Sequence, residues 1–177
     1  MLLVKNAEVY APEYLGKKDL LICGGKIECM QDSIGELPVK CEILDAEGKI
    51  LTPGFLDQHV HITGGGGEGS FHTRTPELQM SELVENGITT VVGLLGTDGI
   101  TRSVDNLYAK TRVLCEEGVS AYMLTGAYGY PSPTLTGEID RDIVFVKEIL
   151  GVKLAISDHR APNVTEDQLI QIASKAR

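Results

Sequence analysis

The sequence contains no long, uninterrupted apolar run. Lys5 and Glu8 interrupt the amino terminus, MLLVKNAEVY, before it reaches the length of a signal peptide. No later run approaches the roughly 18 consecutive apolar residues of a membrane helix. We therefore expect a cytoplasmic protein with no membrane partner.

Positive charge and paired cysteines are also scarce. The 177 residues include 16 Lys and Arg against 25 Asp and Glu, a formal net charge of -9 that is spread along the chain. A nucleic-acid binder needs basic residues to neutralise phosphates, so we expect no nucleic-acid partner. The four cysteines have neither CxxC pairing nor disulfide-dense spacing. We predict that they are small buried apolar residues rather than zinc or redox ligands.

The chain divides into two regions of different pattern. Up to residue 52, short β-prone runs (LLVKNAEVYA, DLLICGGKIECM and CEILDAEGKIL) alternate with Gly-Gly and Glu-Gly turns, as hairpins do. From Pro53 onward, apolar strands alternate with helix-like segments, which is typical of βα units and a parallel sheet. We predict a small β-domain over residues 1–52 and an α/β domain over residues 53–177.

Glycine introduces three of the strands in the second region. Gly87, Gly118 and Gly151 precede ITTVVGLLG, VSAYMLTGA and VKLAISD, at about the 30-residue spacing of a βα unit. Each glycine suits the left-handed position that closes a helix. Thr75-Pro76 fits a helix start, and Thr165 begins a capping box.

The number of strands indicates an incomplete barrel. With GFLDQHVHI as the first strand, the second region holds four βα units. A closed eight-stranded barrel usually needs about 250 residues. We therefore predict an α/β fold that is the first half of a (β/α)8 barrel, unless the four units form an open sheet.

Two histidines stand one residue apart at the end of the first of these strands. Because side chains alternate across a strand, Asp57, His59 and His61 are expected on one face. Two imidazoles on one face can bind the same ion, and barrel active sites lie at the carboxyl ends of strands. We predict a metal site, with zinc as the candidate ion. The alternative is a pair of hydrogen-bonded or exposed histidines.

A glycine-rich loop follows the histidines. Residues 64–67 are all glycine and Glu68 comes next. Such a loop exposes backbone N–H groups and could hold an anionic or amphoteric ligand, while a plain flexible loop is equally consistent with its composition. The loop is no phosphate-binding P-loop, because the glycine spacing and the following Lys-Ser or Lys-Thr are missing.

Polar residues in and after the later strands are further candidates. Lys153 lies early in the apolar run GVKLAIS, where a lysine is unusual without a partner and should be far from the carboxyl edge. Thr97, Tyr128 and Arg160 each follow a strand-like run. Tyrosine can donate to a carbonyl oxygen and arginine can bind a carboxylate, although each could equally be an ordinary loop residue.

The combination of motifs resembles a known family. PGFLDQHVHITGGGGEG, TRTPE, VVGLLGTD, LTGAY and GVKLAISDHR together are similar to the isoaspartyl dipeptidases, a branch of the amidohydrolase superfamily. The resemblance implies a small β-sandwich beside a metal-dependent (β/α)8 barrel. It also implies hydrolysis of β-aspartyl dipeptides with release of aspartate, and assembly into a homo-oligomer.

The resemblance also assigns a metal site. His59 and His61 would bind the more buried of two zinc ions, and Lys153, carboxylated on its nitrogen, would bridge both ions. A hydroxide that bridges the ions would attack the scissile carbonyl.

The implied substrate site comprises Gly66, Gly67, Glu68, Thr97, Tyr128 and Arg160. Glu68 would meet the α-amino group of the substrate with Thr97 nearby, and Arg160 would hold a carboxylate. Tyr128 would stabilise the oxyanion, so that Glu68 and Tyr128 count as the catalytic residues.

The family takes further ligands from later strands, and the chain ends before them. We therefore expect weak zinc binding and no peptidase activity from these 177 residues alone. Two other interpretations stay open: a dihydropyrimidinase-like cyclic amidase, or a non-catalytic fragment of the fold.

Overall fold

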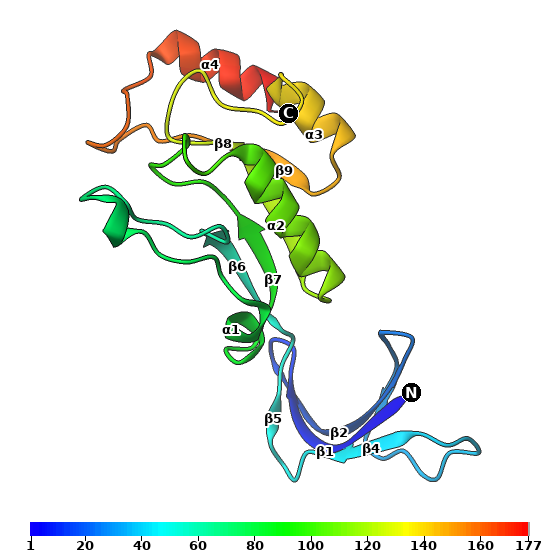
Figure 1. Ribbon diagram of the computed structural model, residues 1–177. Helices are drawn as coiled ribbons and strands as arrows, with labels where there is room; N and C mark the ends of the chain where they lie inside the picture. The colour runs from blue at the N-terminus through cyan, green and yellow to red at the C-terminus, as the bar shows by residue number, and fades with distance from the viewer. Residues whose placement is uncertain (177) are drawn as a thin grey trace. The chain divides into compact units, whose positions relative to one another are not determined.

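The computed structural model describes residues 1–176, and Arg177, the last residue of the predicted second domain, lies outside the described residues. The chain forms two compact units, Met1–Pro53 and Gly54–Arg177, which are traced in Figure 1. Within residues 1–176, no helix combines the length and the apolar character needed to cross a membrane.

The first unit is a five-stranded sheet in the order β3-β2-β1-β4, with β5 also paired to β1. Its strands are β1 (Leu2–Tyr10), β2 (Tyr14–Cys23), β3 (Lys26–Gln31), β4 (Glu42–Asp45) and β5 (Ile50–Leu51). A small core forms where Val4, Ala7 and Val9 of β1 pack with Leu20 of β2.

The predicted hairpins are confirmed in only part of this unit. β2 and β3 pair antiparallel around Gly24 and Gly25, which both have positive φ. The third run differs, because β4 and β5 both lie parallel to β1. Glu47 and Gly48 between them have φ of 51° and 77°. This Glu-Gly pair therefore makes a local break in one strand direction, and the hairpin predicted there is wrong.

The cysteines are less buried than predicted. All four are free, but Cys23 is exposed, and Cys29, Cys41 and Cys115 are only partly buried. The prediction of buried cysteines was therefore wrong for Cys23.

The second unit has the predicted α/β pattern, with a parallel sheet in the order β6-β7-β8-β9. Its strands are β6 (Phe55–Val60), β7 (Ile88–Gly93), β8 (Ser120–Gly126) and β9 (Ile149–Lys153). Its helices are η1 (Phe71–Thr73), α1 (Met80–Val84), α2 (Val104–Glu116), α3 (Ile139–Phe145) and α4 (Glu166–Lys175). α1 packs on β7, α2 on β8 and α3 on β9.

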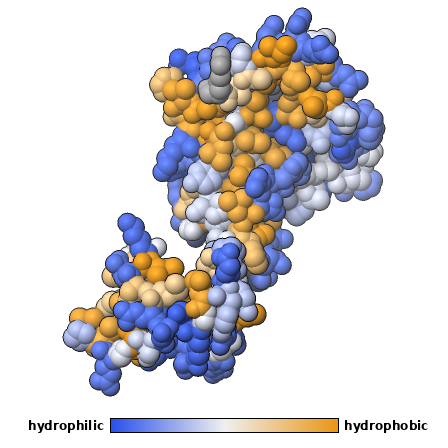
Figure 2. Space-filling model, turned by 180° about the vertical axis from the view of Figure 1, so that it is seen from behind, coloured by the Kyte–Doolittle hydropathy of each residue, from blue (hydrophilic) through white to orange (hydrophobic). Residues whose placement is uncertain are grey.

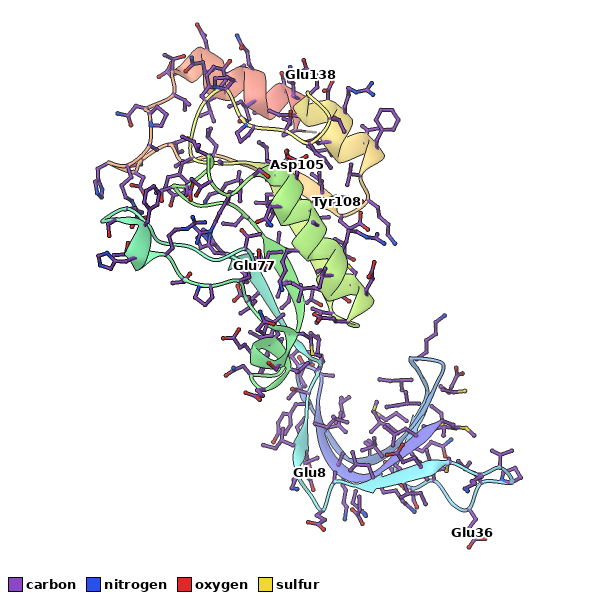
Figure 3. The ribbon with its side chains drawn as sticks, viewed as in Figure 1. Glu8, Glu36, Glu77, Asp105, Tyr108 and Glu138 are labelled. Atoms are coloured by element: carbon purple, nitrogen blue, oxygen red, sulfur yellow. The ribbon has the colours of Figure 1, made fainter. Side chains whose placement is uncertain are left out.

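The core of this unit lies between the sheet and its helices, with Val91, Leu107 and Met123 fully buried. Glu77 ties the segment after η1 to α2, because its carboxylate accepts a bond from Asn106 at 3.4 Å (Figure 3). Apolar side chains also gather on the face of the unit seen in Figure 2. Phe55 on β6 is 61% exposed, as expected for an edge strand of an open sheet.

Two of the three predicted helix-closing glycines are confirmed. Gly87 and Gly118 have φ of 71° and 99°, values that an L side chain rarely adopts. Gly151 instead lies inside β9, which begins two residues earlier at Ile149. The turn before β9 needs no left-handed residue, since Val146 at the end of α3 is already extended.

One of the two predicted helix starts is correct. Thr165 caps α4 in a capping box with Gln168, as predicted. Thr75-Pro76 does not start a helix, and α1 begins at Met80. The Thr75 hydroxyl, which would cap such a helix, instead accepts a hydrogen bond from the Gly65 N–H at 2.7 Å.

Candidate active site

The predicted site residues collect at the carboxyl edge of the parallel sheet. The segments that follow β6, β7 and β9 project to the same side in Figure 1, because parallel strands end at one edge. A pocket of about 110 Å³ lies among these segments. Its lining comprises His61, Gly64, Gly65, Gly66, Glu68, Gly96, Thr97, Asp98, Arg102, Tyr128 and Arg160.

The two histidines lie side by side, with ring centroids 5.6 Å apart and an edge-to-face arrangement. His59 is on β6, whereas His61 lies one residue beyond the end of the strand. The Nδ1 atom of His61 is 3.2 Å from the Leu94 carbonyl, so Nδ1–H donates there and Nε2 keeps a lone pair. A side chain at Gly96 would crowd this ring, since a Cβ would lie 2.9 Å from Cε1.

Burial lowers the pKa of His61 below its ordinary value, and the nearby positive charges of His59 and Lys153 add to the effect. His61 is therefore neutral at neutral pH, which is the form that binds a metal. Lys153 approaches the ring of Tyr128, which lines the same pocket as His61.

Lys153 is the last residue of β9 and lies at the carboxyl edge of the sheet. The prediction that Lys153 lies far from this edge was wrong, because the strand starts before Gly151 and already ends at Lys153. Burial lowers the pKa of Lys153, and its Nζ atom is 5.2 Å from the centroid of the Tyr128 ring.

The donor chemistry of this cluster fits a metal ion in part. His61 offers a free Nε2 with His59 beside it, and imidazole is a common zinc ligand. Within residues 1–176, no group of three or more His, Cys, Asp or Glu side chains is arranged to hold a metal. The chain therefore offers two imidazoles and the amine of Lys153.

The glycine loop is a folded structure with little freedom. Gly64 and Gly66 have φ of 83° and 70°, and a Cβ on them would lie 2.3 Å from the Thr75 carbonyl oxygen and 2.5 Å from that of Thr73. The Gly64 N–H donates to the His61 carbonyl at 2.8 Å. With the Gly65 N–H bonded to Thr75, the backbone donors expected to be free are partly occupied.

Glu68 is the point where three of the loops meet. Its Oε1 atom accepts hydrogen bonds from the Thr97 hydroxyl at 2.9 Å and from Arg160 Nη1 at 2.8 Å. The Tyr128 ring lies beside them, with its centroid 5.8 Å from Arg160 Cζ. The structure thus brings together side chains that follow β6, β7, β8 and β9.

Asp158 holds Arg160 from the other side and was missed in the sequence. Its two carboxylate oxygens accept bonds from Arg160 Nε at 2.9 Å and Nη2 at 2.7 Å. Arg102 and Asp98, which also line the pocket, were missed too. The only sequence signal for them is their place shortly after a strand.

The Asp158 carboxyl should stay ionised in acid. Hydrogen bonds from the Arg160 side chain, and then from its backbone N–H, hold the pKa of Asp158 well below its usual range. Because the folded pKa is depressed, its stabilisation is complete above the ordinary value of about 3.9 and is lost as pH falls through the folded value. In a carboxyl-carbon NMR titration, Asp158 should not titrate near pH 4. Arg160→Met should raise the midpoint toward the ordinary value, although the bond from the backbone N–H of residue 160 remains, and a wild-type midpoint near 4 would contradict the prediction.

No protein-family model matches the chain, but several known proteins do. The chain is 49% identical to a beta-aspartyl dipeptidase structure from Fervidobacterium islandicum AW-1, with a TM-score of 0.94 over 98% of this chain and 48% of that chain. The same dipeptidase in complex with beta-Asp-Leu gives 48% identity and a TM-score of 0.92, over 98% and 46% of the two chains. The chain thus spans about half the length of these structures.

Cyclic amidases are also similar. A dihydroorotase of Listeria monocytogenes serotype 4a (strain HCC23) is 35% identical over 126 residues, which are 69% of this chain and 28% of that protein. A D-hydantoinase of a Thermus species shares the fold, with a TM-score of 0.64 at 21% identity over 97% and 36% of the two chains. The predicted α/β fold, four βα units of a (β/α)8 barrel, is confirmed by this agreement. Together these similarities support assignment of the chain to the amidohydrolase superfamily of hydrolases.

Proposed function

We propose that this chain supplies the substrate-binding loops and part of the metal site of a hydrolase that cleaves β-aspartyl dipeptides. The observation that carries the proposal is the meeting of Glu68, Thr97 and Arg160 at the sheet edge where His61 lines the same pocket and Lys153 ends β9. A carboxylate and a guanidinium beside each other suit a ligand that carries both an ammonium and a carboxylate group.

Each charged side chain of the site would bind the substrate group of opposite charge. Glu68 and the hydroxyl of Thr97 would accept the α-ammonium group of the substrate, and Arg160 would bind its carboxylate. Glu68 and Arg160 now bond each other at 2.8 Å, so a zwitterionic dipeptide would replace one ion pair with two. A ligand with a single charge would replace that ion pair with only one new pair.

The remaining residues would act at the scissile bond. The Tyr128 hydroxyl would donate to the carbonyl oxygen as negative charge develops on it. His59, His61 and Lys153 as a carbamate would hold zinc, and bound zinc would supply Lewis-acid polarisation and activation of water. The depressed pKa of Lys153 supports this assignment, since only the neutral amine can take up carbon dioxide.

Cyclic amide hydrolysis is the second candidate, because the Listeria dihydroorotase is similar in sequence. Cyclic ureides such as dihydroorotate and hydantoin have no ammonium group for Glu68. A comparison of β-aspartyl-leucine with dihydroorotate as ligands therefore separates the two candidates.

Glu68→Gln should weaken binding of β-aspartyl-leucine by roughly 10- to 100-fold, since a hydrogen bond to a charged group contributes about 1.5–3 kcal/mol. Isothermal titration with the 177-residue chain measures the change. Glu77→Gln is the matched control, because the side chains of Glu77 and Glu68 are 46% and 45% exposed, and it should alter affinity less than twofold. Tighter binding of dihydroorotate than of the dipeptide, or equal effects of the two substitutions, would refute the proposal.

A further inference from the structure

Arg102 is a buried cation that bonds Gly65 and Asp98, which line the candidate pocket, and also Thr63 and Thr75. The residue is 4% exposed. Its Nε atom donates to the Thr63 carbonyl at 2.9 Å, and Nη2 donates to the carbonyls of Gly65 and Thr75, each at 3.1 Å. Nη1 donates to Asp98 at 3.3 Å. One guanidinium therefore joins the start of the glycine loop to the segment that returns from it.

These bonds satisfy groups that the loop cannot satisfy by itself. Gly64 and Gly66 hold left-handed conformations, which glycine adopts at a high cost in conformational entropy. Thr63 is buried, and its carbonyl needs a donor, which Arg102 supplies; the Gly65 carbonyl accepts from the Thr75 N–H at 2.9 Å as well as from Arg102. Without Arg102, the carbonyls of Thr63, Gly65 and Thr75 would lose a partner.

The same contacts couple the two loops that meet at Glu68. Glu68 is three residues after Gly65, and Thr97, which donates to Glu68 at 2.9 Å, directly precedes Asp98. Arg102 thus fixes the backbone on the Glu68 side through Gly65 and on the Thr97 side through Asp98. A lysine could not reproduce this pattern, because its ammonium lacks the planar fork of donors.

We propose that Arg102 is a positioning residue that sets the conformation of the glycine loop and thereby places Glu68 for the substrate ammonium. Arg102 touches no reacting atom and acts through the Gly65 carbonyl and Asp98. The role in substrate binding rests on the proposed function, whereas the role in loop conformation stands on the contacts alone.

The test compares Arg102→Met, which keeps the side-chain length without donors, with Arg102→Lys, which keeps the charge. Hydrogen exchange of the Gly65 amide, which is bonded to the Thr75 hydroxyl, reports on the loop. We expect exchange at least tenfold faster in R102M and an intermediate rate in R102K. Titration with β-aspartyl-leucine should show affinity reduced at least tenfold in R102M and partly restored in R102K.

Arg112→Met is the control, since Arg112 lies on α2, the helix that begins just after Arg102, and bonds Glu148 at 2.6 Å, outside the candidate site. It should leave Gly65 exchange and dipeptide affinity within twofold of the wild type. If R102M fails to fold, R102K carries the test, and wild-type exchange and affinity in a folded R102K would overturn the proposal. If the wild type binds no dipeptide, the proposed function fails, while Gly65 exchange still decides whether Arg102 positions the loop.

Discussion

Replacement of Asp142 by alanine is expected to lower the free energy of unfolding of the second unit by roughly 3–5 kcal/mol. Asp142 lies on α3 and is fully buried. One carboxylate oxygen accepts bonds from the Leu135 N–H at 2.9 Å and from the Thr125 hydroxyl, and the other accepts from the N–H and hydroxyl of Thr136, both at 2.7 Å. Alanine would leave these donors without a partner, and each orphaned group costs about 1–3 kcal/mol.

Asp140→Ala is the matched control, because Asp140 is an exposed aspartate in the same helix, and it should change stability by less than about 0.5 kcal/mol. Asp142→Asn keeps the shape but replaces one acceptor oxygen with a donor, so it should also destabilise strongly. Chemical denaturation followed by circular dichroism measures all three variants. If D142N were as stable as the wild type, the hydrogen bonds would not be the source of the stability.

The Asp142 contacts also bear on the site, because they close the segment that carries Tyr128. Thr125 lies at the end of β8 and Leu135 in the loop before α3, so the carboxylate fixes both ends of the intervening chain. The Gly126 N–H adds a bond to the Pro133 carbonyl at 2.9 Å. The position of Tyr128 beside Arg160 therefore depends on a buried carboxylate outside the pocket.

Local sequence patterns were sufficient to predict the repeating elements of the second unit. Alternating apolar strands and helical segments gave the four parallel strands, because each element buries one face against the next. The capping box at Thr165 was found from four adjacent residues. The histidine pair was predicted from strand alternation, and its rings do lie together, although His61 stands just beyond the strand.

The features that the sequence did not reveal depend on contacts between distant residues. Arg102 bonds carbonyls that are 27 to 39 residues away, and backbone acceptors leave no residue-type pattern. Thr75-Pro76 has the composition of a helix start, but Thr75 is bonded to Gly65 and to Arg102 and lies outside any helix. Lys153 was misplaced because β9 ends at Lys153 and does not continue through the apolar residues that follow it, so the lysine is the last residue of the strand and not an early one.

The glycine loop should tolerate no side chain at its first position. In Gly64→Ala, the new Cβ would lie 2.3 Å from the Thr75 carbonyl oxygen and 2.7 Å from that of Pro76, at a φ of 83°. The left-handed conformation costs an L-residue about 1–2 kcal/mol, and the overlap adds roughly 1–3 kcal/mol unless the loop moves. Movement would break the Gly65–Thr75 bonds that hold the loop, so affinity for β-aspartyl-leucine should fall at least tenfold.

Gly118→Ala separates the two causes, because Gly118 has a φ of 99° and nothing within 4 Å of a new Cβ. It should show only the conformational cost, with dipeptide affinity unchanged. The difference between the two variants in free energy of unfolding therefore measures the cost of the contact between a Cβ at position 64 and the Thr75 segment. Equal stability losses in G64A and G118A, together with equal affinities, would mean that the loop adapts to a side chain. The four glycines would then be needed for their backbone conformation alone, and the close packing of the loop would have no part in holding Glu68.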